Sequence, residues 1–399
     1  MRTLLKGNGA AARAVQMAGA QVISAYPITP QTSLIEELAE MVAQGRLNAR
    51  FIKVESEHSA LAACIAAASV GARTFTATSS QGLALMHELL HWAAGSRLPI
   101  VMVNVNRALG APWSLFTEQT DSLSQRDTGW MQVYCQSAQE ALDTVIQSFE
   151  VSQRVLLPCM VLLDGFLLSH TFENVDVPEQ STVDSFLGPL KLPHMLDLAR
   201  PATIGGLSDP DCYTAFRRKI QIAHERALEV WADVGRQWGE LTGRSYDVVE
   251  EYRLHDAEVV LVTSSTPAMT ARVAIDALRE RGFAAGLLRL RVFRPFPADA
   301  LRRALARKRE VIVLDRSCSF GHHGIFHQET KSALYELPAA DRPPIRGIIA
   351  GLGGRDITPE DIEQMLLQGS EGKGSEPVTW WNALPEEEAV EAEPCAATK

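Results

Sequence analysis

Paired cysteines are absent from this sequence of 399 residues. Its six cysteines lie far apart, and no two of them form a C-x-x-C pair. The usual ligand patterns of zinc sites and iron–sulfur clusters are therefore missing. We expect reduced and mostly buried thiols, and we expect any iron–sulfur cluster that works with this protein to be bound by another chain.

Long apolar runs and an excess of positive charge are absent too. No apolar run approaches the ~20 residues that a membrane-spanning helix needs, and no apolar core of signal-peptide length follows the N-terminal residues. The 38 Lys and Arg residues are outnumbered by 48 Asp and Glu residues, and the resulting net charge of −10 argues against nucleic-acid binding. With 46% apolar and 22% charged residues, the composition is that of a globular protein. The sequence predicts a soluble, cytoplasmic protein with no membrane or nucleic-acid partner.

Short apolar strands alternate with helical patterns along most of the chain, which predicts an α/β fold with two parallel-sheet domains. In the first part, strands are expected at residues 21–26, 51–54, 73–78, 99–105 and 156–163, and helices at 32–45, 58–71 and 83–94. The alternation fades between residues 169 and 210, and one long helix is expected at 215–241. It then restarts with a strand at 258–262, a helix at 269–281, a strand at 285–290, a helix at 298–308 and a strand at 311–314.

We divide the chain into three parts. A first domain covers residues 1–255 and ends with the long helix, a smaller domain covers 256–368, and an acidic tail covers 369–399. The tail holds seven Glu and two Lys residues, so it carries −5 of the net −10 and cannot build a core of its own. We expect Trp380 and Trp381 to attach the tail to a neighbouring surface, that of a partner subunit by preference, with simple disorder as the alternative.

Polar side chains follow four of the expected strands, and ligands of open parallel sheets bind beyond the C-terminal ends of strands. These four segments are Tyr26–Pro30, Glu55–His58, Thr78–Gly82 and Asn104–Arg107. Two prolines hold the Thr29 hydroxyl in a stiff turn, where it either faces a ligand or caps the next helix. Glu57 either faces a ligand or simply begins a helix. Arg107 either binds a carboxylate through two hydrogen bonds or pairs with an internal acid.

Two further motifs carry less weight. Gly7-Asn8-Gly9 looks like part of a dinucleotide-binding fingerprint, but we expect no strand in front of it and discount this function. His322, His323 and His327 lack the spacing and the companion carboxylate of a usual metal site, so a loop or a subunit contact is the preferred interpretation. We assign no metal ligand to this chain.

Taken in order, the four strand-end segments resemble the α subunit of the multi-subunit 2-oxoacid:ferredoxin oxidoreductases, most closely those that act on pyruvate. The likeness covers nearly all of residues 1–365. Further motifs that carry it are Arg126-Asp127-Thr128-Gly129-Trp130, Leu163-Asp164-Gly165-Phe166, Arg291-Val292-Phe293-Arg294-Pro295-Phe296-Pro297 and Ala350-Gly351-Leu352-Gly353-Gly354. The resemblance implies a thiamine diphosphate enzyme, in which the first domain has the thiamine-diphosphate-binding (pyrimidine) fold and the second is transketolase-C-terminal-like.

The same resemblance implies roles for individual residues. The family glutamate that matches Glu57 bonds to N1′ of the aminopyrimidine, where a buried carboxylate promotes the imino tautomer that can take the C2 proton. Thr29 matches a threonine beside the reacting carbons, and Arg107 matches the arginine that binds the substrate carboxylate. Glu57, Thr29 and Arg107 are thus the implied catalytic residues. The implied cofactor-binding residues are Tyr26, Pro27, Ile28, Glu57, Ser80 and Gln81.

Partners are implied by what the chain lacks. No Gly-Asp-Gly followed by an Asn pair is present, so the resemblance places Mg²⁺, the diphosphate half of the site and the [4Fe-4S] clusters in partner subunits. It implies beta-, gamma- and delta-type subunits, ferredoxin, CoA and a 2-oxoacid as partners and substrates. The isolated chain is expected to be inert.

The implied activity is the reversible, CoA-dependent oxidative decarboxylation of pyruvate to acetyl-CoA and CO₂, with reduction of ferredoxin. Thr29 favours a 2-oxoacid over oxalate, because oxalate-using relatives have an arginine in that turn. Relatives often carry Asp-His-Gln-Asp where this chain has Glu118-Gln119-Thr120-Asp121, and the missing histidine leaves a branched-chain or other 2-oxoacid open as the substrate. The alternative outside catalysis is a scaffold subunit of such a complex.

Overall fold

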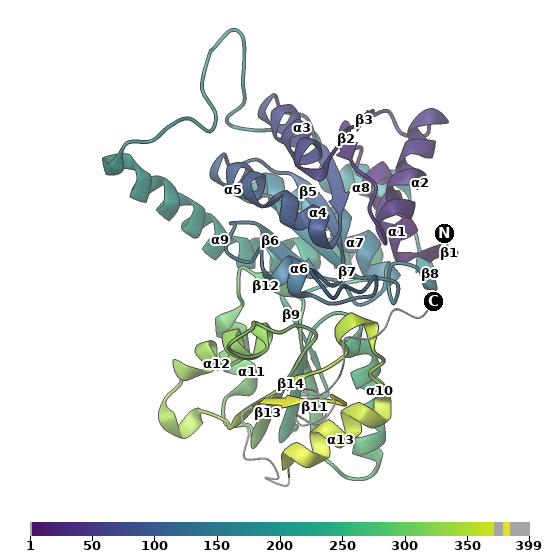
Figure 1. The fold of residues 1–399 in the computed structure, drawn as a ribbon, viewed down its shortest axis with the longest axis vertical. Helices are drawn as coiled ribbons and strands as arrows, with labels where there is room; N and C mark the ends of the chain where they lie inside the picture. Colours follow the sequence, from purple (N-terminus) through teal and green to yellow (C-terminus); the bar gives the residue numbers. More distant parts are fainter. Residues whose placement is uncertain (1, 371–377, 384–399) are drawn as a thin grey trace.

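The computed structural model describes residues 2–370 and 378–383, which form two α/β domains lying one above the other in Figure 1. The first domain is built on a seven-stranded sheet with the strand order β12-β6-β7-β5-β4-β2-β3. All neighbours in this sheet are parallel except β12 and β6. Its strands are β2 (Val22–Ala25), β3 (Arg50–Lys53), β4 (Thr74–Thr78), β5 (Val101–Asn106), β6 (Met131–Tyr134), β7 (Cys159–Asp164) and β12 (Val292–Arg294).

Helices cover both faces of this sheet, so the central strands β4 to β7 are buried along their whole length. The core on one face is shared with α1 (Gly7–Met17), α2 (Thr32–Ala43), α7 (Ala138–Val155), α8 (Gln180–Leu187) and the 33-residue α9 (Pro210–Thr242). The core on the other face is shared with α3 (Glu57–Ser69), α4 (Ser80–Leu85) and α5 (His87–Gly95). The short α6 (Thr120–Leu123) follows β5, and a two-stranded sheet joins β1 (Arg2–Lys6) to β8 (Phe172–Asp176).

The second domain contains a six-stranded sheet with the order β15-β14-β13-β10-β11-β9. Its strands are β9 (Val249–Tyr252), β10 (Val259–Thr263), β11 (Ala285–Leu290), β13 (Glu310–Asp315), β14 (Ile345–Ile349) and β15 (Val378–Trp380). Its helices are α10 (Pro267–Glu280), α11 (Ala298–Leu305), α12 (Ile325–Tyr335) and α13 (Pro359–Ser370), with 3-10 turns η1 (Ala339–Asp341) and η2 (Leu352–Gly354). Only β9 runs antiparallel to its neighbour in this sheet.

The two domains share backbone pairing and an apolar core. Strand β12 follows β11 of the second sheet directly, yet it crosses over to pair with β6 of the first. Rings from both domains meet edge to face beside it, with centroids 5.6 Å apart for Tyr134 and Phe326 and 5.1 Å apart for Phe293 and Phe326. This contiguous core fixes the two domains against each other.

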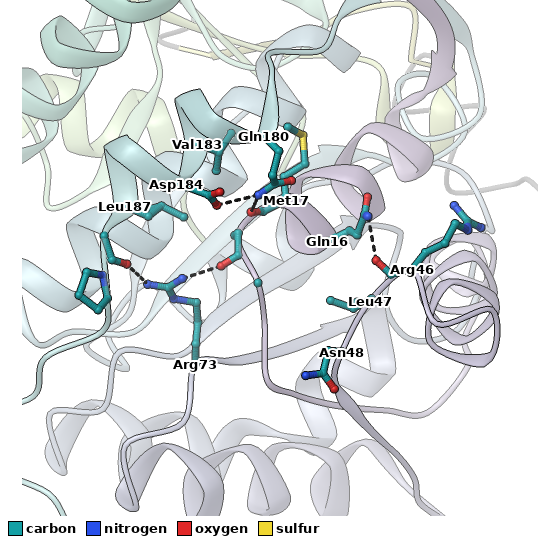
Figure 2. A pocket seen from close by; sticks show the side chains of 14 residues that line it. Gln16, Met17, Arg46, Leu47, Asn48, Arg73, Gln180, Val183, Asp184 and Leu187 are labelled. Atoms are coloured by element: carbon teal, nitrogen blue, oxygen red, sulfur yellow. Dashed lines mark hydrogen bonds between the residues drawn. The ribbon is translucent and has the colours of Figure 1, made fainter.

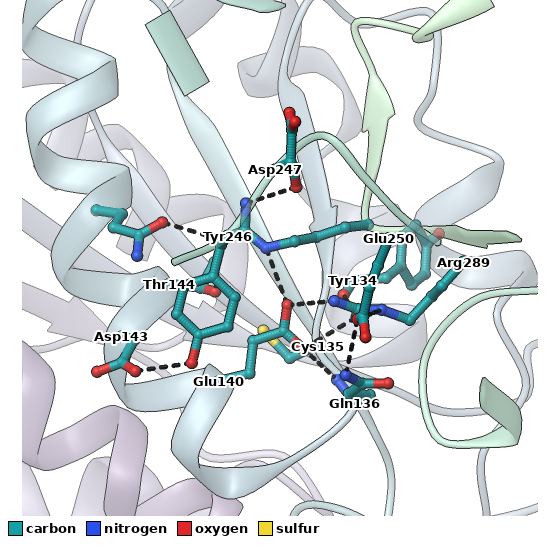
Figure 3. Close-up of polar contacts among 12 residues, drawn as sticks. Tyr134, Cys135, Gln136, Glu140, Asp143, Thr144, Tyr246, Asp247, Glu250 and Arg289 are labelled. Carbon is teal, nitrogen blue, oxygen red and sulfur yellow. Dashed lines mark hydrogen bonds and ion pairs between the residues drawn. The ribbon is translucent and has the colours of Figure 1, made fainter. Parts of the chain in front are cut away.

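A buried ion-pair network joins the domains at a second point (Figure 3). Glu140 of α7 accepts hydrogen bonds of 2.9 Å from both Arg289 and Arg291, and all three side chains are buried. Burial alone would raise the pKa of Glu140, but the two guanidinium groups hold it below its ordinary value. Arg291 is itself enclosed by the rings of Trp231 and Tyr246, 5.3 and 5.0 Å from their centroids.

Local sequence signals account for the helix ends. Ser56 caps α3 by accepting a hydrogen bond from the Ser59 amide. Asp209 caps α9 and Pro210 occupies its first turn, so this helix begins before residue 215, where the periodicity placed it. It ends at Gly243, whose φ of +77° suits the left-handed cap conformation.

Several expectations need correction. A strand, β1, does precede Gly7, but it pairs antiparallel with β8 outside the main sheet, so the dinucleotide motif still lacks its parallel-sheet setting. The second sheet takes in β9, which lies before residue 256, and β15, which lies beyond residue 368. Strand β6 and helix α7 were not expected.

Trp380 and Trp381 lie on their own chain. Strand β15 pairs with β14, and the Trp381 indole packs on the core of the second domain while its Nε1 donates to Asp361 at 3.0 Å. The rest of the predicted acidic tail, 371–377 and 384–399, is outside the described residues.

Four of the five described cysteines are buried, and all five are free thiols, as the sequence predicts. Burial raises the pKa of Cys64 and of Cys159 to about 12, which keeps both thiols protonated at neutral pH. No helix among residues 2–370 and 378–383 is both long and apolar enough to cross a membrane.

Candidate active site

The predicted site residues lie on loops that leave one edge of the first sheet. Strands β5, β4, β2 and β3 are parallel neighbours, so their C-terminal ends lie side by side. Thr29 follows β2, Glu57 follows β3, the Ser80-Gln81 pair follows β4, and Arg107 follows β5. The topology therefore brings together residues that are up to 78 positions apart in the sequence.

Arg107 lies at the centre of this cluster. Its Nη1 donates to the Thr29 carbonyl at 2.6 Å, and its Nη2 donates to Oε1 of Gln81. Its Nε is buried, and no group among the described residues accepts a hydrogen bond from it. Burial lowers the pKa of Arg107, while the nearby Asp121 and Glu57 carboxylates raise it. The guanidinium thus stays charged at neutral pH, and only two of its five N–H groups donate to the described part of the protein, through Nη1 and Nη2.

Glu57 is the first residue of α3 and only 6% exposed. Its carboxylate lies against Gly82, where an added Cβ would come within 2.6 Å of Oε1 and within 2.5 Å of the Thr78 hydroxyl. The buried hydroxyls of Thr78 and Ser79 near it have no hydrogen-bond partner within residues 2–370 and 378–383. Since buried polar groups without partners are costly, this cluster favours a polar ligand that supplies a donor to Glu57.

The Tyr26–Pro30 turn is fixed by hydrogen bonds to its own domain, and most of its residues are exposed. Asn8 donates to the Pro30 carbonyl at 2.9 Å, and Gln31 donates to the Ala77 carbonyl at 2.7 Å. Tyr26, Pro27 and Thr29 are exposed, and Ile28 is half-buried. The predicted cofactor-binding turn is therefore held in place and accessible from outside the domain.

Ser80 differs from the other predicted cofactor-binding residues because it is fully buried. Its hydroxyl lies 2.6 Å from both the Ala108 carbonyl and Oε1 of Gln81, and its amide donates to Asp121 at 2.9 Å. Its φ of +49° turns the chain sharply at the start of α4. In this arrangement Ser80 orients Gln81 and the Arg107 loop.

Asp121 is the residue to which the sequence reasoning gave no role. Its carboxylate, buried beneath Arg107, accepts hydrogen bonds from the backbone amides of Ser80 (2.9 Å), Arg107 (3.2 Å) and Ser122 (2.8 Å). It also accepts them from the side chains of Asn104 (3.0 Å) and Asn106 (2.6 Å). Burial raises the pKa of Asp121 to about 6, against the lowering effect of these bonds. The only sequence signal was an acid kept in the segment 118–121 that departs from the family pattern.

A cavity of about 640 Å³ lies elsewhere (Figure 2). It is lined by Leu47, Asn48 and Arg73, which precede β3 and β4, and so it opens at the opposite edge of the sheet. Arg73 there donates to the carbonyls of Ala18 and Gly188 and holds the two walls together. We therefore place the candidate site at the strand ends, where the charged and unpartnered groups gather.

The sequence is similar to known proteins over nearly its whole length. Residues 13–236 match the family model described as pyruvate flavodoxin/ferredoxin oxidoreductase, thiamine diphosphate-binding, and residues 257–362 match the pyruvate:ferredoxin oxidoreductase core domain II. The chain is 48% identical to the ketoisovalerate oxidoreductase subunit VorA of Pyrococcus abyssi, over 96% of this chain and 98% of that one. It is also 48% identical to the pyruvate synthase subunit PorA of Methanothermobacter thermautotrophicus, over 96% and 99%.

Two solved structures share the fold. The 2-oxoglutarate:ferredoxin oxidoreductase of Magnetococcus marinus superposes with a TM-score of 0.72 at 19% identity, over 92% of this chain and 65% of that one. A split-gene transketolase superposes with a TM-score of 0.57 at 11% identity, over 93% and 99%. At these identities the likeness shows the architecture alone.

Proposed function

This chain belongs to the 2-oxoacid:ferredoxin oxidoreductase family as an α-type subunit, and from that premise we propose that it supplies the aminopyrimidine side and the carboxylate-binding side of an active site acting on pyruvate. The reaction is the reversible, CoA-dependent oxidative decarboxylation of pyruvate to acetyl-CoA and CO₂ with reduction of ferredoxin. The observation that carries the proposal is the placement of Arg107 and Glu57. The buried Nε of Arg107 has no acceptor among the described residues, and the buried Glu57 carboxylate lies near enough to raise the pKa of this guanidinium.

The residues present fit the aminopyrimidine of thiamine diphosphate. Glu57 would accept a hydrogen bond from a protonated ring nitrogen, and Gly82 permits the close approach of this carboxylate because any side chain there would meet it. Thiamine diphosphate, when bound, supplies the carbanion chemistry at the 2-oxo carbon. Glu57 would hold the proton at the ring nitrogen, and its buried setting would strengthen that bond.

Arg107 and Thr29 act on the substrate. The guanidinium binds the carboxylate of the 2-oxoacid through charge-assisted hydrogen bonds. The exposed Thr29 lies next to it, since its carbonyl accepts from Arg107, and Gln31 and Asn8 hold its turn in place. Gln81 and the Thr29 carbonyl fix the plane of the guanidinium before substrate arrives. This preorganisation lowers the entropy that binding costs.

The remaining half of the site is proposed to come from beta-, gamma- and delta-type subunits, with Mg²⁺ and [4Fe-4S] clusters held there. Large apolar side chains are exposed around the site, as expected of a surface that another subunit covers. They are Tyr26, which is 38% exposed, and Trp113, which is 59% exposed and lies over Arg107.

We propose pyruvate as the substrate and keep a branched-chain 2-oxoacid as the second candidate. The second candidate stays because relatives named for either substrate are 48% identical to this chain. The test is made on the complex, purified without oxygen through a tag on this chain. We expect CoA-dependent reduction of a viologen dye to be fastest with pyruvate among pyruvate, 2-oxobutyrate, 2-oxoisovalerate, 2-oxoglutarate and oxalate. Preference for 2-oxoisovalerate would favour the second substrate, and oxalate as the best substrate would refute the site assignment around Thr29.

Glu57→Gln separates catalysis from scaffolding in the same preparation. The amide keeps the shape of the side chain but accepts the ring proton poorly, so turnover should fall by about a hundredfold or more while the complex assembles normally. The matched control is Glu88→Gln on the neighbouring α5, because that side chain is 74% exposed. Turnover of the Glu57→Gln complex at the unaltered rate would favour a scaffold subunit.

A further inference from the structure

The segment 108–119 runs from Arg107 of the first domain onto the second domain. At its start, the Ala108 carbonyl accepts a hydrogen bond from the Ser80 hydroxyl, and the Ala108 amide donates to the Phe116 carbonyl at 3.3 Å. At its end, the Gln119 amide donates to the Arg316 carbonyl at 2.9 Å. One end is therefore fixed by the candidate site and the other by the neighbouring domain.

A glycine turn of the second domain supports the middle of the segment. The Gly354 amide donates to the Thr117 carbonyl at 3.0 Å, and Ser114 donates to the Gly353 carbonyl at 3.3 Å. A Cβ added at Gly354 would lie 2.3 Å from Cβ of Phe116, and the φ of Gly354 is +83°. Only glycine permits this approach, so the glycines at 353 and 354 have a packing role that their motif alone did not reveal.

A buried charge pair, Asp164 with Arg316, connects the same segment to the second domain. Asp164 is fully buried and accepts hydrogen bonds from Thr117 at 3.1 Å and from Gln119 at 3.2 Å. It also pairs with Arg316 of the second domain at 3.1 Å and accepts a hydrogen bond from the Thr266 amide at 3.0 Å. A side-chain network of this kind holds the segment in a single position relative to both domains.

Trp113 stands at the exposed turn of this segment. Its ring centroid lies 5.2 Å from the guanidinium carbon of Arg107, and the residue is 59% exposed. Arg107 reaches past it to Thr29 and Gln81, so the indole covers the guanidinium from one side. A 2-oxoacid held by Arg107 would meet this ring with the rest of its molecule.

We propose that segment 108–119 forms one wall of the 2-oxoacid pocket, in which Trp113 is a specificity-determining residue and Gly354 is a positioning residue that acts through Phe116. The proposal rests on the proposed function, since it takes Arg107 as the group that binds the carboxylate. The indole limits the size of the substituent beside the 2-oxo group. The second domain, which does not touch the carboxylate, sets how tightly the 2-oxoacid binds.

The specificity arm replaces Trp113 by Leu and by Ala in the complex. Because added room in an apolar pocket changes selectivity by about 10- to 200-fold, we expect the ratio of kcat/KM for 2-oxoisovalerate to that for pyruvate to rise at least about tenfold. An unchanged ratio in both variants would overturn the specificity role. This arm remains decisive if the glycine variant below fails to assemble.

The positioning arm compares two glycines. Gly354→Ala places a Cβ on Phe116, whereas Gly282→Ala has the same backbone strain, with a φ of +82°, but meets no atom within 4 Å. We expect the first variant alone to raise the KM for pyruvate, by on the order of tenfold, with kcat nearly unchanged. The inhibition constant of propionate, a carboxylate without the reactive carbonyl, should rise in parallel, and thiamine diphosphate content should stay the same.

The outcomes separate this inference from the proposed function. If Gly354→Ala leaves both constants unchanged while Arg107→Lys raises them, segment 108–119 does not set binding and the inference is wrong, although the function stands. If Arg107→Lys leaves them unchanged, the function assigned to Arg107 fails first. A loss of kcat equal to the loss of kcat/KM in Gly354→Ala would point to the chemical step and would also overturn the positioning role.

Discussion

Replacing Arg107 by lysine should weaken binding of the 2-oxoacid far more than it slows turnover. The guanidinium is held in its plane by the Thr29 carbonyl at 2.6 Å and by Gln81, and its Nε is free for the ligand. A lysine ammonium keeps the charge but lacks the planar set of N–H donors with which a guanidinium binds both oxygens of a carboxylate. The loss of one charge-assisted hydrogen bond costs about 1.5–3 kcal/mol, which corresponds to an increase in KM of about 10- to 150-fold.

The assay is viologen reduction by the anaerobic complex over a range of pyruvate concentrations, which gives kcat and KM separately. Arg97→Lys is the matched control. Arg97 donates to the carbonyls of Leu156 (2.8 Å) and Val155 (2.7 Å), so it also uses its fork on main-chain acceptors, but away from the candidate site. We expect that variant to lose stability without a change in KM.

An Arg107→Lys complex of normal size and cofactor content whose KM matches the unaltered protein would refute the reasoning. Arg107 would then be a structural residue that joins the Thr29 turn to α4. A fall in kcat with an unchanged KM would place Arg107 in the chemical step and not in carboxylate binding.

Three further changes test the buried groups. Asp121→Asn puts an amide donor among the five donors that bond Asp121 and should lower the free energy of unfolding by about 1–3 kcal/mol. The measurement is a lower Tm than that of the control Asp127→Asn, whose side chain is 80% exposed. Equal Tm values would contradict the network. Glu140→Gln leaves two buried guanidinium groups without their carboxylate and should cost about 3–5 kcal/mol in urea unfolding; a loss near zero would contradict the network of Figure 3. Burial raises the pKa of Asp315 to about 7, so the folded chain keeps a proton that the unfolded chain releases near pH 4. Stability from Asp315 therefore falls as the pH rises from about 4 to 7, by up to ~1.4 kcal/mol per pH unit. Asp315→Asn should flatten this slope in thermal melts, and an unchanged slope would show that Asp315 does not carry it.

The location of the site followed from local patterns. Strands of four to six residues are followed within a few residues by Pro, Glu, Ser or Arg, and parallel strands joined by helices must place those residues at one edge. The predicted strand at 73–78 is β4 (Thr74–Thr78), and that at 99–105 is β5 (Val101–Asn106). Buried strands and amphipathic helices leave a clear periodic signal, and this is why these elements were predictable.

Elements whose partners lie far along the chain were not predictable in this way. Strand β1 is mostly half-exposed and pairs with β8, some 170 residues away, so it shows no buried alternation. Strand β12 is three residues long, and its place in the first sheet depends on β6, about 160 residues before it. No window of sequence contains both partners, and propensity gives way to tertiary pairing in such cases.

The sequence by itself determined the two-sheet α/β class, the cluster of Thr29, Glu57 and Arg107, and the need for partner subunits, because each depends on local periodicity or on motifs. Only the tertiary structure decided what surrounds Arg107. Asp121 is buried among groups from separate loops of the first domain, and Gly354 of the second domain approaches Phe116 of the first within a space that admits no Cβ. Such contacts follow from close packing, which leaves no trace in the spacing of residues along either segment alone.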